Sequence, residues 1–462
     1  MSATTVVELD TTALEGLVRG ELIRPGDESY DKARAVHNAM IDRRPALIVR
    51  CVDVADVIAV VNFARENDAR LAVRCGGHNV AGFGAVDDGI VLDLSPMKGI
   101  KVDPAARVAT VQGGCTWGDV DHATHAFGLA TAGGVVSTTG VGGLTLGGGL
   151  GYLTRRCGLS IDNLLAADVV LPDGSFVTAS EDQNEDLFWA LRGGGGNFGV
   201  VTSFTFRLHP IHTVVAGPML WHIEQAHDAM RMYEQLMADA PDDLNGLFAF
   251  LMVPPGPPFP EELHLKTVCG VVWCHTGTPA EADEALPRAR ALGPAFELVG
   301  PMPHPVLQSM FDELTVSGMQ EYWRADFLNE LSDESIAAHV EHGGKVPSVF
   351  SGTFIFPIDG AAGRIARDET AFSYRDARFA EVINGIDPDP ASADALKSWV
   401  VESWDAVHPY AAAGAYLNFI ADEGQERVQA SYRENYVRLA ELKKRYDPTN
   451  LFRLNQNIRP AD

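Results

Sequence analysis

Between residues 45 and 79, apolar residues occur first as a continuous run, then at helical spacing, then as a second continuous run. This pattern predicts a strand, a helix and a second strand. Residues 46–49 and 71–73 are short, continuous apolar runs of the kind that form buried strands. Between them, apolar side chains recur at helical spacing from Val54 to Ala64. Asp53 is the expected N-cap of this helix, with Asp56 as its capping-box partner.

The same patterns continue along the first half of the chain. Apolar runs at residues 90–94 and 108–111 predict a hairpin-like pair of strands. A further helix is expected to begin at Thr116, with Asp119 at its third position, and to end at Gly128.

The pattern changes from about residue 212 onward. Long apolar or alternating runs, at residues 247–253, 268–273 and 349–356, are separated by proline-rich and acidic helical stretches. This arrangement predicts an antiparallel sheet with helices on one face, and an α+β fold overall. A last helix is expected over residues 432–446, with the basic residues 443–445 at the negative end of its dipole.

Glycine is concentrated between residues 133 and 199, in two bursts at 140–149 and 192–199. Apolar residues alternate with these glycines and strand-like runs flank them, unlike a flexible linker. Backbone N–H groups in such loops can line a polyanionic ligand. The bursts contain neither a GxxxxGK[ST] P-loop nor a strand-flanked GxGxxG, so a phosphate-rich ligand is expected in a different kind of site.

Composition excludes several classes of partner. The chain has 462 residues, too many for one hydrophobic core, and a net charge of −26. That charge repels nucleic acid and anionic membranes, and no signal peptide or membrane-spanning stretch is visible, so a cytoplasmic protein is expected. The six cysteines show no paired spacing and are expected to be thiols. The histidine pairs 122/125 and 209/212 lack a third ligand at motif spacing, so no metal site is expected.

The chemistry-bearing feature of the first half is His78, at the end of the loop Arg74-Cys75-Gly76-Gly77-His78-Asn79. A strand delivers this loop, and its glycines allow a flat ligand to come close. Four later motifs follow in order: Gly140-Val141-Gly142-Gly143-Leu144 through Gly151; Arg156-Cys157-Gly158-Leu159 with Asp162-Asn163; Asp186-Leu187-Phe188-Trp189 through Gly199; and Tyr446-Asp447-Pro448-Thr449-Asn450-Leu451-Phe452 with Asn455-Gln456-Asn457-Ile458. In this order the chain resembles the berberine-bridge-enzyme-like flavoproteins of the vanillyl-alcohol-oxidase (PCMH-type) fold, over nearly its whole length.

The resemblance implies FAD as cofactor and three segments: a two-subdomain FAD-binding domain (1–211), a substrate-binding domain (212–410) and a C-terminal segment that returns to the flavin (411–462). It implies that the His78 imidazole is bonded to the flavin 8α-methyl group. The other implied cofactor-binding residues are Arg74, Cys75, Gly76, Gly77, Asn79, Thr138, Thr139, Gly140, Gly142, Gly143, Gly149, Asn197, Gly199, Val200, Asn455 and Asn457.

One position departs from the family pattern. Many members form a second flavin bond from a cysteine just before the first glycine burst, and Val136 stands in its apparent place here. Valine cannot form a thioether. Single attachment through His78 is therefore expected, as in the bacterial 6-hydroxynicotine-oxidase-like members. Cys157 is a weak substitute candidate, and a packed thiol is the better interpretation.

The catalytic residues implied by the resemblance are Tyr416 and Asn418, in Tyr416-Leu417-Asn418-Phe419. Strand alternation would place both on one face, with Leu417 and Phe419 on the other. Tyr416 as a base needs its pKa, ordinarily about 10, lowered by about 2–3 units through a cation or the flavin. The alternative is that Tyr416 is a substrate-stacking or structural aromatic. Tyr322 and Tyr374 are further candidates for the substrate pocket, or else simply sheet aromatics.

These features predict an FAD-linked oxidase that takes hydride from a carbon bearing oxygen or nitrogen in a small molecule and passes it to flavin N5. Tyr416 would accept the proton, and dioxygen would be reduced to hydrogen peroxide. Two alternatives remain. One is a dehydrogenase with another electron acceptor, and the other is a non-catalytic flavin-binding or storage protein. The oligomeric state does not follow from the sequence.

Overall fold

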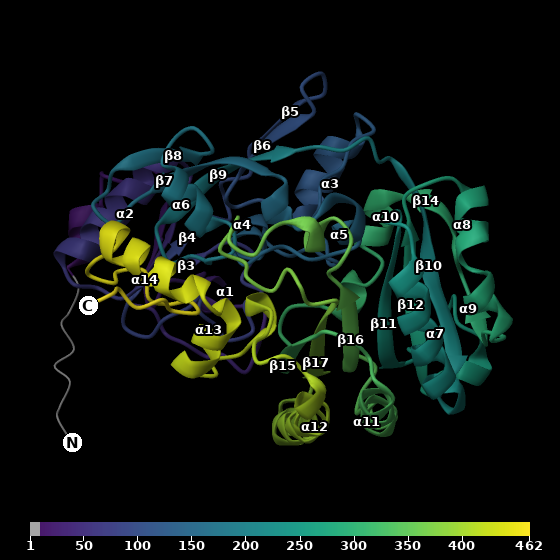
Figure 1. Cartoon of the computed structure of the whole chain (residues 1–462). Coiled ribbons are helices and arrows are strands. Elements are labelled where there is room, and N and C mark those ends of the chain that lie inside the picture. Colours follow the sequence, from purple (N-terminus) through teal and green to yellow (C-terminus); the bar gives the residue numbers. More distant parts are fainter. Residues whose placement is uncertain (1–9) are drawn as a thin grey trace.

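Three β-sheets organise residues 10–462, the part of the chain that this computed structural model describes (Figure 1). The first sheet contains the predicted strand–helix–strand unit, with a later strand inserted between its two strands. In sheet order its strands are β1 (Glu21–Ile23), β2 (Leu47–Arg50), β4 (Ile90–Asp93) and β3 (Leu71–Arg74). Both β2 and β3 pair with β4 in parallel.

The predicted hairpin of residues 90–94 and 108–111 is wrong, because the two strands belong to different sheets. The second of them, β6, pairs antiparallel with β5 and β9 in the second sheet. Alternation identified both strands but carries no information about their partners. The order of the second sheet is β5 (Ile100–Asp103), β6 (Val108–Gln112), β9 (Val200–Arg207), β7 (Leu164–Val170) and β8 (Phe176–Ser180).

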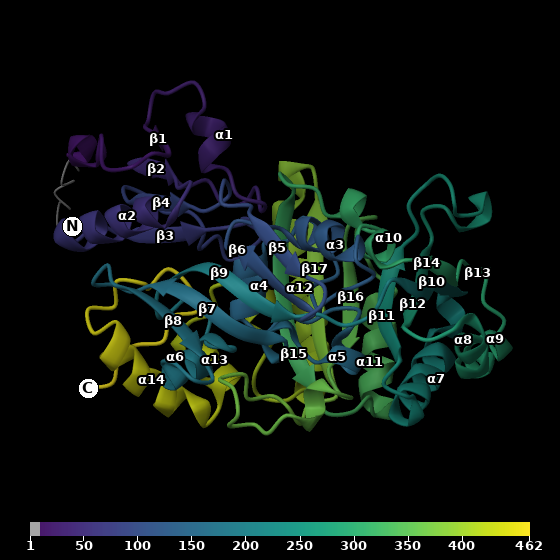
Figure 2. The same ribbon diagram turned by 90° about the horizontal axis from the view of Figure 1, so that it is seen from above.

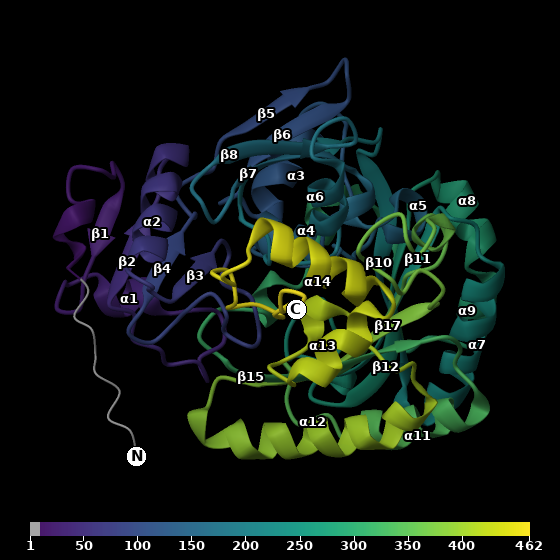
Figure 3. The ribbon, with the colours of Figure 1, turned by 60° about the vertical axis from the view of Figure 1, so that its left-hand side comes forward.

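The third sheet is antiparallel and has helices on one face, as the apolar runs beyond residue 212 predict. Helices α7 (Ala226–Asp239), α11 (Asp333–Gly343) and α12 (Ala393–Val407) cover that face (Figures 1 and 3). The strand order is β13 (Phe296–Glu297), β10 (Thr213–His222), β12 (Thr267–His275), β11 (Leu244–Met252), β16 (Gly352–Pro357), β17 (Phe379–Asp387) and β15 (Gln320–Leu328), with β14 (Gly300–Pro303) also paired to β10. The α+β class is confirmed. The expected boundary at residues 211 and 212 falls between β9 and β10.

Helix α2 (Val54–Glu66) begins as its sequence predicts, but with half of the expected capping box. The Asp53 side chain accepts a hydrogen bond from the Asp56 backbone N–H. The Asp56 carboxylate instead accepts backbone N–H groups of Arg19, Gly20 and Val52. It therefore ties the N-terminal segment to the first turn of α2. Helix α3 (Trp117–His125) has the full capping box of Thr116 and Asp119.

The C-terminal segment crosses back to the first half of the chain, where α14 lies beside α6 (Figures 1 and 2). The single helix predicted over 432–446 is two helices, α13 (Gln425–Tyr432) and α14 (Asn435–Tyr446), separated by Arg433 at a φ of 49°. Lys443 lies in the last turn of α14, as expected for the negative end of the helix dipole. It is fully buried, and its ammonium donates to the Asn197 carbonyl, the Asp447 carboxylate and the Phe452 carbonyl.

The other helices are short and connect the sheets. They are α1 (Tyr30–Arg34), α4 (Val141–Leu146), α5 (Thr154–Cys157), α6 (Glu185–Leu191), α8 (Pro279–Ala285), α9 (Pro287–Ala291) and α10 (His304–Gln308). None of the helices in residues 10–462 is both long enough and apolar enough to cross a membrane.

Candidate functional site

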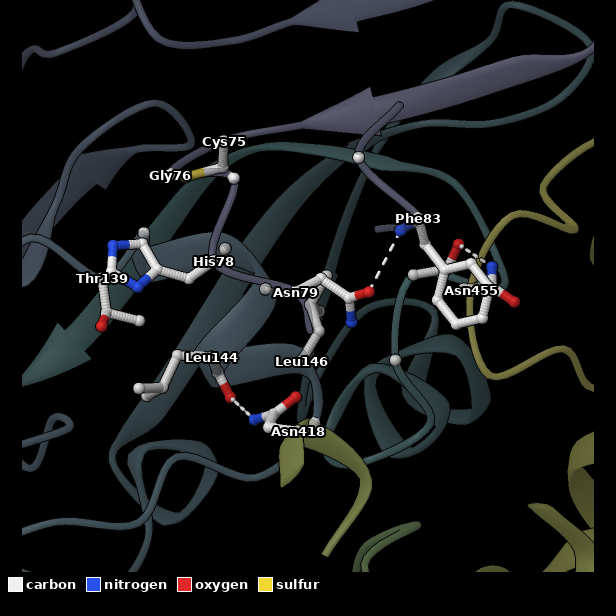
Figure 4. Close-up of a pocket in the computed structure, with 18 of the residues that line it drawn as sticks. Cys75, Gly76, His78, Asn79, Phe83, Thr139, Leu144, Leu146, Asn418 and Asn455 are labelled. Atoms are coloured by element: carbon white, nitrogen blue, oxygen red, sulfur yellow. Dashed lines mark hydrogen bonds between the residues drawn. The ribbon is translucent and has the colours of Figure 1, made fainter. Parts of the chain in front are cut away.

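A cavity of about 310 Å³ lies where the three parts of the chain meet. Its walls come from the His78 loop, both glycine-rich stretches, strand β15 and the C-terminal segment. Figure 4 shows His78, Asn79 and Thr139 beside Leu144, with Asn418 and Asn455 entering from two stretches of the C-terminal segment. Residues more than 300 positions apart in sequence therefore share one wall.

The His78 loop leaves the carboxyl end of β3, and ion pairing and backbone contacts fix its course. Arg74 donates to the buried Asp93 carboxylate at 2.8 Å, which anchors the start of the loop. The His78 Nε2 lies 3.1 Å from the Thr138 Oγ1, which leaves Nδ1 as the ring nitrogen available to a ligand. Burial, reinforced by the neighbouring His37, lowers the pKa of His78 to about 3. The imidazole is therefore neutral over the physiological range.

Glycine is required where the two loops touch. A Cβ on Gly76 would lie 2.4 Å from the Gly140 backbone nitrogen, and a Cβ on Gly140 would be as close to the Gly76 nitrogen. Gly143 and Gly196 differ, because a Cβ on either would meet no protein atom within 4 Å although both line the cavity. These two positions leave open the space that a bound group would fill. We call Gly143, Gly196 and the neighbouring cavity-lining glycines the glycine cradle. Together with the Asn455 Oδ1, which has no hydrogen-bond partner, this cradle fits an FAD molecule held through backbone groups.

Most of the predicted cofactor residues line this cavity: Arg74, Cys75, Gly76, Gly77, His78, Asn79, Thr139, Gly140, Gly142, Gly143, Gly199, Val200 and Asn455. Thr138, Gly149, Asn197 and Asn457 do not, and they support the wall from behind. Thr138 contacts His78, and Gly149 donates its N–H to the Tyr416 hydroxyl. Asn197 donates to the Gln456 carbonyl, and the Asn457 carbonyl accepts from Gln425.

Tyr416 and Asn418 come together, although not through strand alternation. Residues 417–419 form a 3₁₀ turn, and all four residues of the motif line the cavity. The Tyr416 hydroxyl oxygen accepts from the Gly149 N–H and the Asn418 amide, both at 2.8 Å. The Asn418 amide also donates to the Leu144 carbonyl at 3.0 Å. Two N–H donors on one phenolic oxygen favour negative charge there.

The lowered pKa that a tyrosine base requires is not present in the protein alone. Burial raises the pKa of Tyr416 to about 12, and the hydrogen bonds from Gly149, Asn418 and the Leu150 backbone oppose that rise only in part. No lysine or arginine in residues 10–462 contributes to lowering it. Of the two expected sources, a cation or the flavin, the described residues supply no cation, which leaves the flavin.

The predicted pocket tyrosines lie elsewhere. Tyr322 packs against the α12 side of the sheet, and its neighbours Glu321 and Trp323 line the cavity instead, because side chains alternate along β15. Tyr374 is buried against Phe327, and its hydroxyl donates to the Ala430 carbonyl. Strand β15 also carries Arg324 and Asp326, so its charged residues fall on both faces and the sequence holds no signal that singles out the cavity face.

The cysteines show one relevant contrast. Val136 lines the cavity, whereas Cys157 is buried outside it, and burial raises the pKa of the Cys157 thiol to about 12. Cys157 is therefore a packed thiol. Within residues 10–462, His, Cys, Asp and Glu side chains form no group of three able to hold a metal ion.

Comparison with known proteins gives full-length matches. Residues 45–180 match the family model for an FAD binding domain, and residues 415–459 match the model described as berberine and berberine like. An FAD-linked oxidoreductase of Dictyostelium discoideum is 31% identical, over 99% of this chain and 98% of its own. The (R)-6-hydroxynicotine oxidase of Paenarthrobacter nicotinovorans is 30% identical, over 96% and 97%. The crystal structure of 6-hydroxy-D-nicotine oxidase from Arthrobacter nicotinovorans superposes with a TM-score of 0.86 at 27% identity and covers 100% of both chains.

Proposed function

The chain belongs to the FAD-linked oxidoreductases with a berberine-like C-terminal segment, and from that premise we propose that it is an oxidase of small organic alcohols or amines. One observation carries the proposal. The neutral His78, the open glycine cradle and the hydrogen-bonded pair of Tyr416 and Asn418 border a single cavity. The residue proposed to bind the cofactor covalently and the polar residues proposed for catalysis therefore line the same cavity.

In this proposal residues 1–211 hold FAD. Residues 212–410 supply the side of the cavity that contacts the substrate, which we call the substrate wall, and residues 411–462 close the site. His78 is the sole covalent tether. Val136 has no nucleophilic atom, Cys157 lies outside the cavity, and burial raises the pKa of the Cys75 thiol, which lines the cavity, to about 11 and so keeps it protonated. The loop 74–79, the glycines of 140–143 and Asn455 hold the cofactor. When bound, FAD supplies the hydride acceptor and passes the electrons on to dioxygen.

Tyr416 is the general base that accepts the proton lost by the substrate hydroxyl or amine. Its oxygen is held by the Gly149 N–H and the Asn418 amide, which orient the phenol and offset part of the cost of its buried charge. Because burial raises the pKa of Tyr416 to about 12, its deprotonated fraction grows throughout the alkaline range. We expect kcat/KM to rise from neutral pH to about pH 10 for this reason.

The substrate is a compact molecule with an apolar body. Trp323 and Ile386 of the third sheet line the cavity together with Leu417 and Phe419, and the Trp323 and Phe419 rings meet edge to face at 6.1 Å. Such a wall favours flat apolar groups, and the acidic surface favours neutral or cationic molecules. One full-length relative is named for 6-hydroxynicotine, so that compound is the first to screen.

The oxidase assignment is tested by reoxidation. The purified yellow protein is reduced anaerobically with dithionite and mixed with air-saturated buffer in a stopped-flow instrument. Rapid recovery of the oxidised spectrum with stoichiometric hydrogen peroxide supports an oxidase. No recovery in air, with recovery on adding an artificial electron acceptor, makes the protein a dehydrogenase.

The role of Tyr416 is tested by Tyr416→Phe, which keeps the ring and removes the phenolic oxygen. We expect kcat to fall about 100-fold or more and the alkaline rise in kcat/KM to disappear. Tyr374→Phe is the matched control, because Tyr374 is equally buried but does not line the cavity. A Tyr416→Phe enzyme with wild-type rate and pH profile would assign Tyr416 to packing alone.

A further inference from the structure

His37, in the loop before β2, lies between the His78 loop and β15. It is only 8% exposed. Its backbone N–H donates to the Gly77 carbonyl, and its carbonyl accepts from the Gly318 N–H. The adjacent Asn38 amide donates to the carbonyls of Val80 and Glu321. This strap of residues 37–39 therefore connects the His78 loop to the strand that carries the substrate wall.

Both ring nitrogens of His37 face oxygen atoms. Nδ1 lies 2.7 Å from the Glu321 Oε1, and Nε2 lies 2.9 Å from the Thr315 carbonyl oxygen. A carboxylate and a carbonyl only accept hydrogen bonds, so this geometry is satisfied by an imidazolium with hydrogen on both nitrogens. Burial opposes the charge, but Glu321 and the Thr315 carbonyl outweigh it and raise the pKa of His37.

The charged ring lies directly beside the tether. The centroids of the His37 and His78 rings are 4.0 Å apart, with 32° between their planes. Glu321 from β15 and His78 from the loop after β3 are the titratable groups that His37 faces, and the next charge, Arg74, is paired with Asp93. A second positive charge on His78 is thus disfavoured by both repulsion and burial.

We propose that His37, held as an imidazolium by Glu321, is the positioning residue that keeps His78 neutral and oriented for bonding to the flavin. The inference rests on the proposed tether at His78. Bond formation exchanges a C–H bond of the flavin methyl group and an imidazole N–H for one C–N bond, and dioxygen takes up the two hydrogen atoms released as hydrogen peroxide. Only a neutral imidazole has the lone pair that this bond requires.

The protonation state of His37 can be measured by NMR in the wild-type protein. In protein labelled with ¹⁵N-histidine, two-bond ¹H–¹⁵N spectra at neutral pH are expected to show both His37 nitrogens protonated, with His37→Gln used for assignment. A His37 ring with one bare nitrogen would overturn the proposal.

The effect on the tether is measured as flavin fluorescence retained by the denatured protein on a gel, during loading of freshly expressed apoprotein with FAD at several pH values. For wild type we expect tether formation to be independent of pH down to about pH 5, since His78 stays neutral. In His37→Gln and Glu321→Gln the loss of rate on acidification is expected to begin at a higher pH than in wild type, although burial still holds the pKa of His78 below the ordinary value for histidine. Glu321→Asp, unlike Glu321→Gln, is expected to show the same dependence of tethering rate on pH as wild type.

His339→Gln is the matched control. His339 forms another buried pair with a carboxylate, Glu381, at 2.9 Å, but lies on α11, away from the cavity lining. It should lower thermal stability and leave the pH profile of tethering unchanged. Wild-type protein that releases all its flavin would refute the tether itself, whereas tethered wild type with an unchanged His37→Gln profile would refute only the role of His37.

Discussion

Lys443→Met is predicted to destabilise the protein because it breaks a buried ion pair. Lys443 and Asp447 are both 0% exposed, and the ammonium Nζ lies 2.7 Å from the Asp447 Oδ2. The same ammonium donates to the carbonyls of Asn197 at 2.6 Å and Phe452 at 2.9 Å. In the variant Asp447 keeps only the backbone N–H groups of Leu451 and Phe452.

Removing one partner of a buried pair leaves an uncompensated charge and costs about 3–5 kcal/mol. Phe452 lines the cavity and Asn197 adjoins Gly196, so we also expect weaker non-covalent FAD binding. Urea unfolding followed by tryptophan fluorescence measures the first effect, and FAD titration of a His78→Ala background measures the second. Asp447→Asn should show a comparable loss, and the double variant should lose less than the two single variants combined.

Lys444→Met is the control, because Lys444 is exposed on the same turn and should change stability by no more than about 0.5 kcal/mol. A loss below about 1 kcal/mol for Lys443→Met would refute the reasoning, since the pair would then contribute no more than a surface salt bridge.

Three other changes have distinct expected outcomes. Gly143→Ala should leave urea unfolding unchanged and lower FAD occupancy, because its Cβ meets no protein atom; equal occupancy would contradict the cradle. Gly76→Ala should instead lose about 1–3 kcal/mol, because its Cβ meets the Gly140 backbone, and wild-type stability would contradict this. Asp121 is 4% exposed with an unpaired Oδ2, and burial raises its pKa to about 8. The folded state therefore holds a proton that the unfolded chain releases near pH 4, so this group lowers stability as pH rises from about 4 to 8. Asp121→Asn should gain roughly 3–4 kcal/mol over wild type by pH 7, and a gain independent of pH would contradict the assignment.

The sequence predicts local structure well where side chains interact with near neighbours. The helix after Asp53 and the capping box of Thr116 and Asp119 are decided within a few residues, and both helices begin as expected. The break at Arg433 was missed because the helical pattern continues across it. The partners of β4 and β6 were missed because alternation specifies a face and not a neighbour.

At the site, too, the features set by nearby residues were predictable and those set by distant residues were not. The glycine loops and His78 were identifiable because their spacing is short and ordered, and they line one cavity. Tyr322 was predicted to line the pocket, whereas Trp323 does. Adjacent residues of a strand point to opposite faces, so an error of one residue selects the wrong face. His37 was missed because its role depends on Glu321, 284 positions away, and on a loop without periodicity.

The central claim, a flavin bonded to His78 alone, is tested most directly by peptide mass mapping of the purified protein. Trypsin places His78 in the peptide from Cys75 to Lys98, which also contains one cysteine. We predict that this peptide carries the mass of one FAD, that fragmentation assigns it to His78 and not to Cys75, and that His78→Ala abolishes it. FAD mass on another peptide, such as the one containing Cys157, or a wholly unmodified digest would contradict the claim.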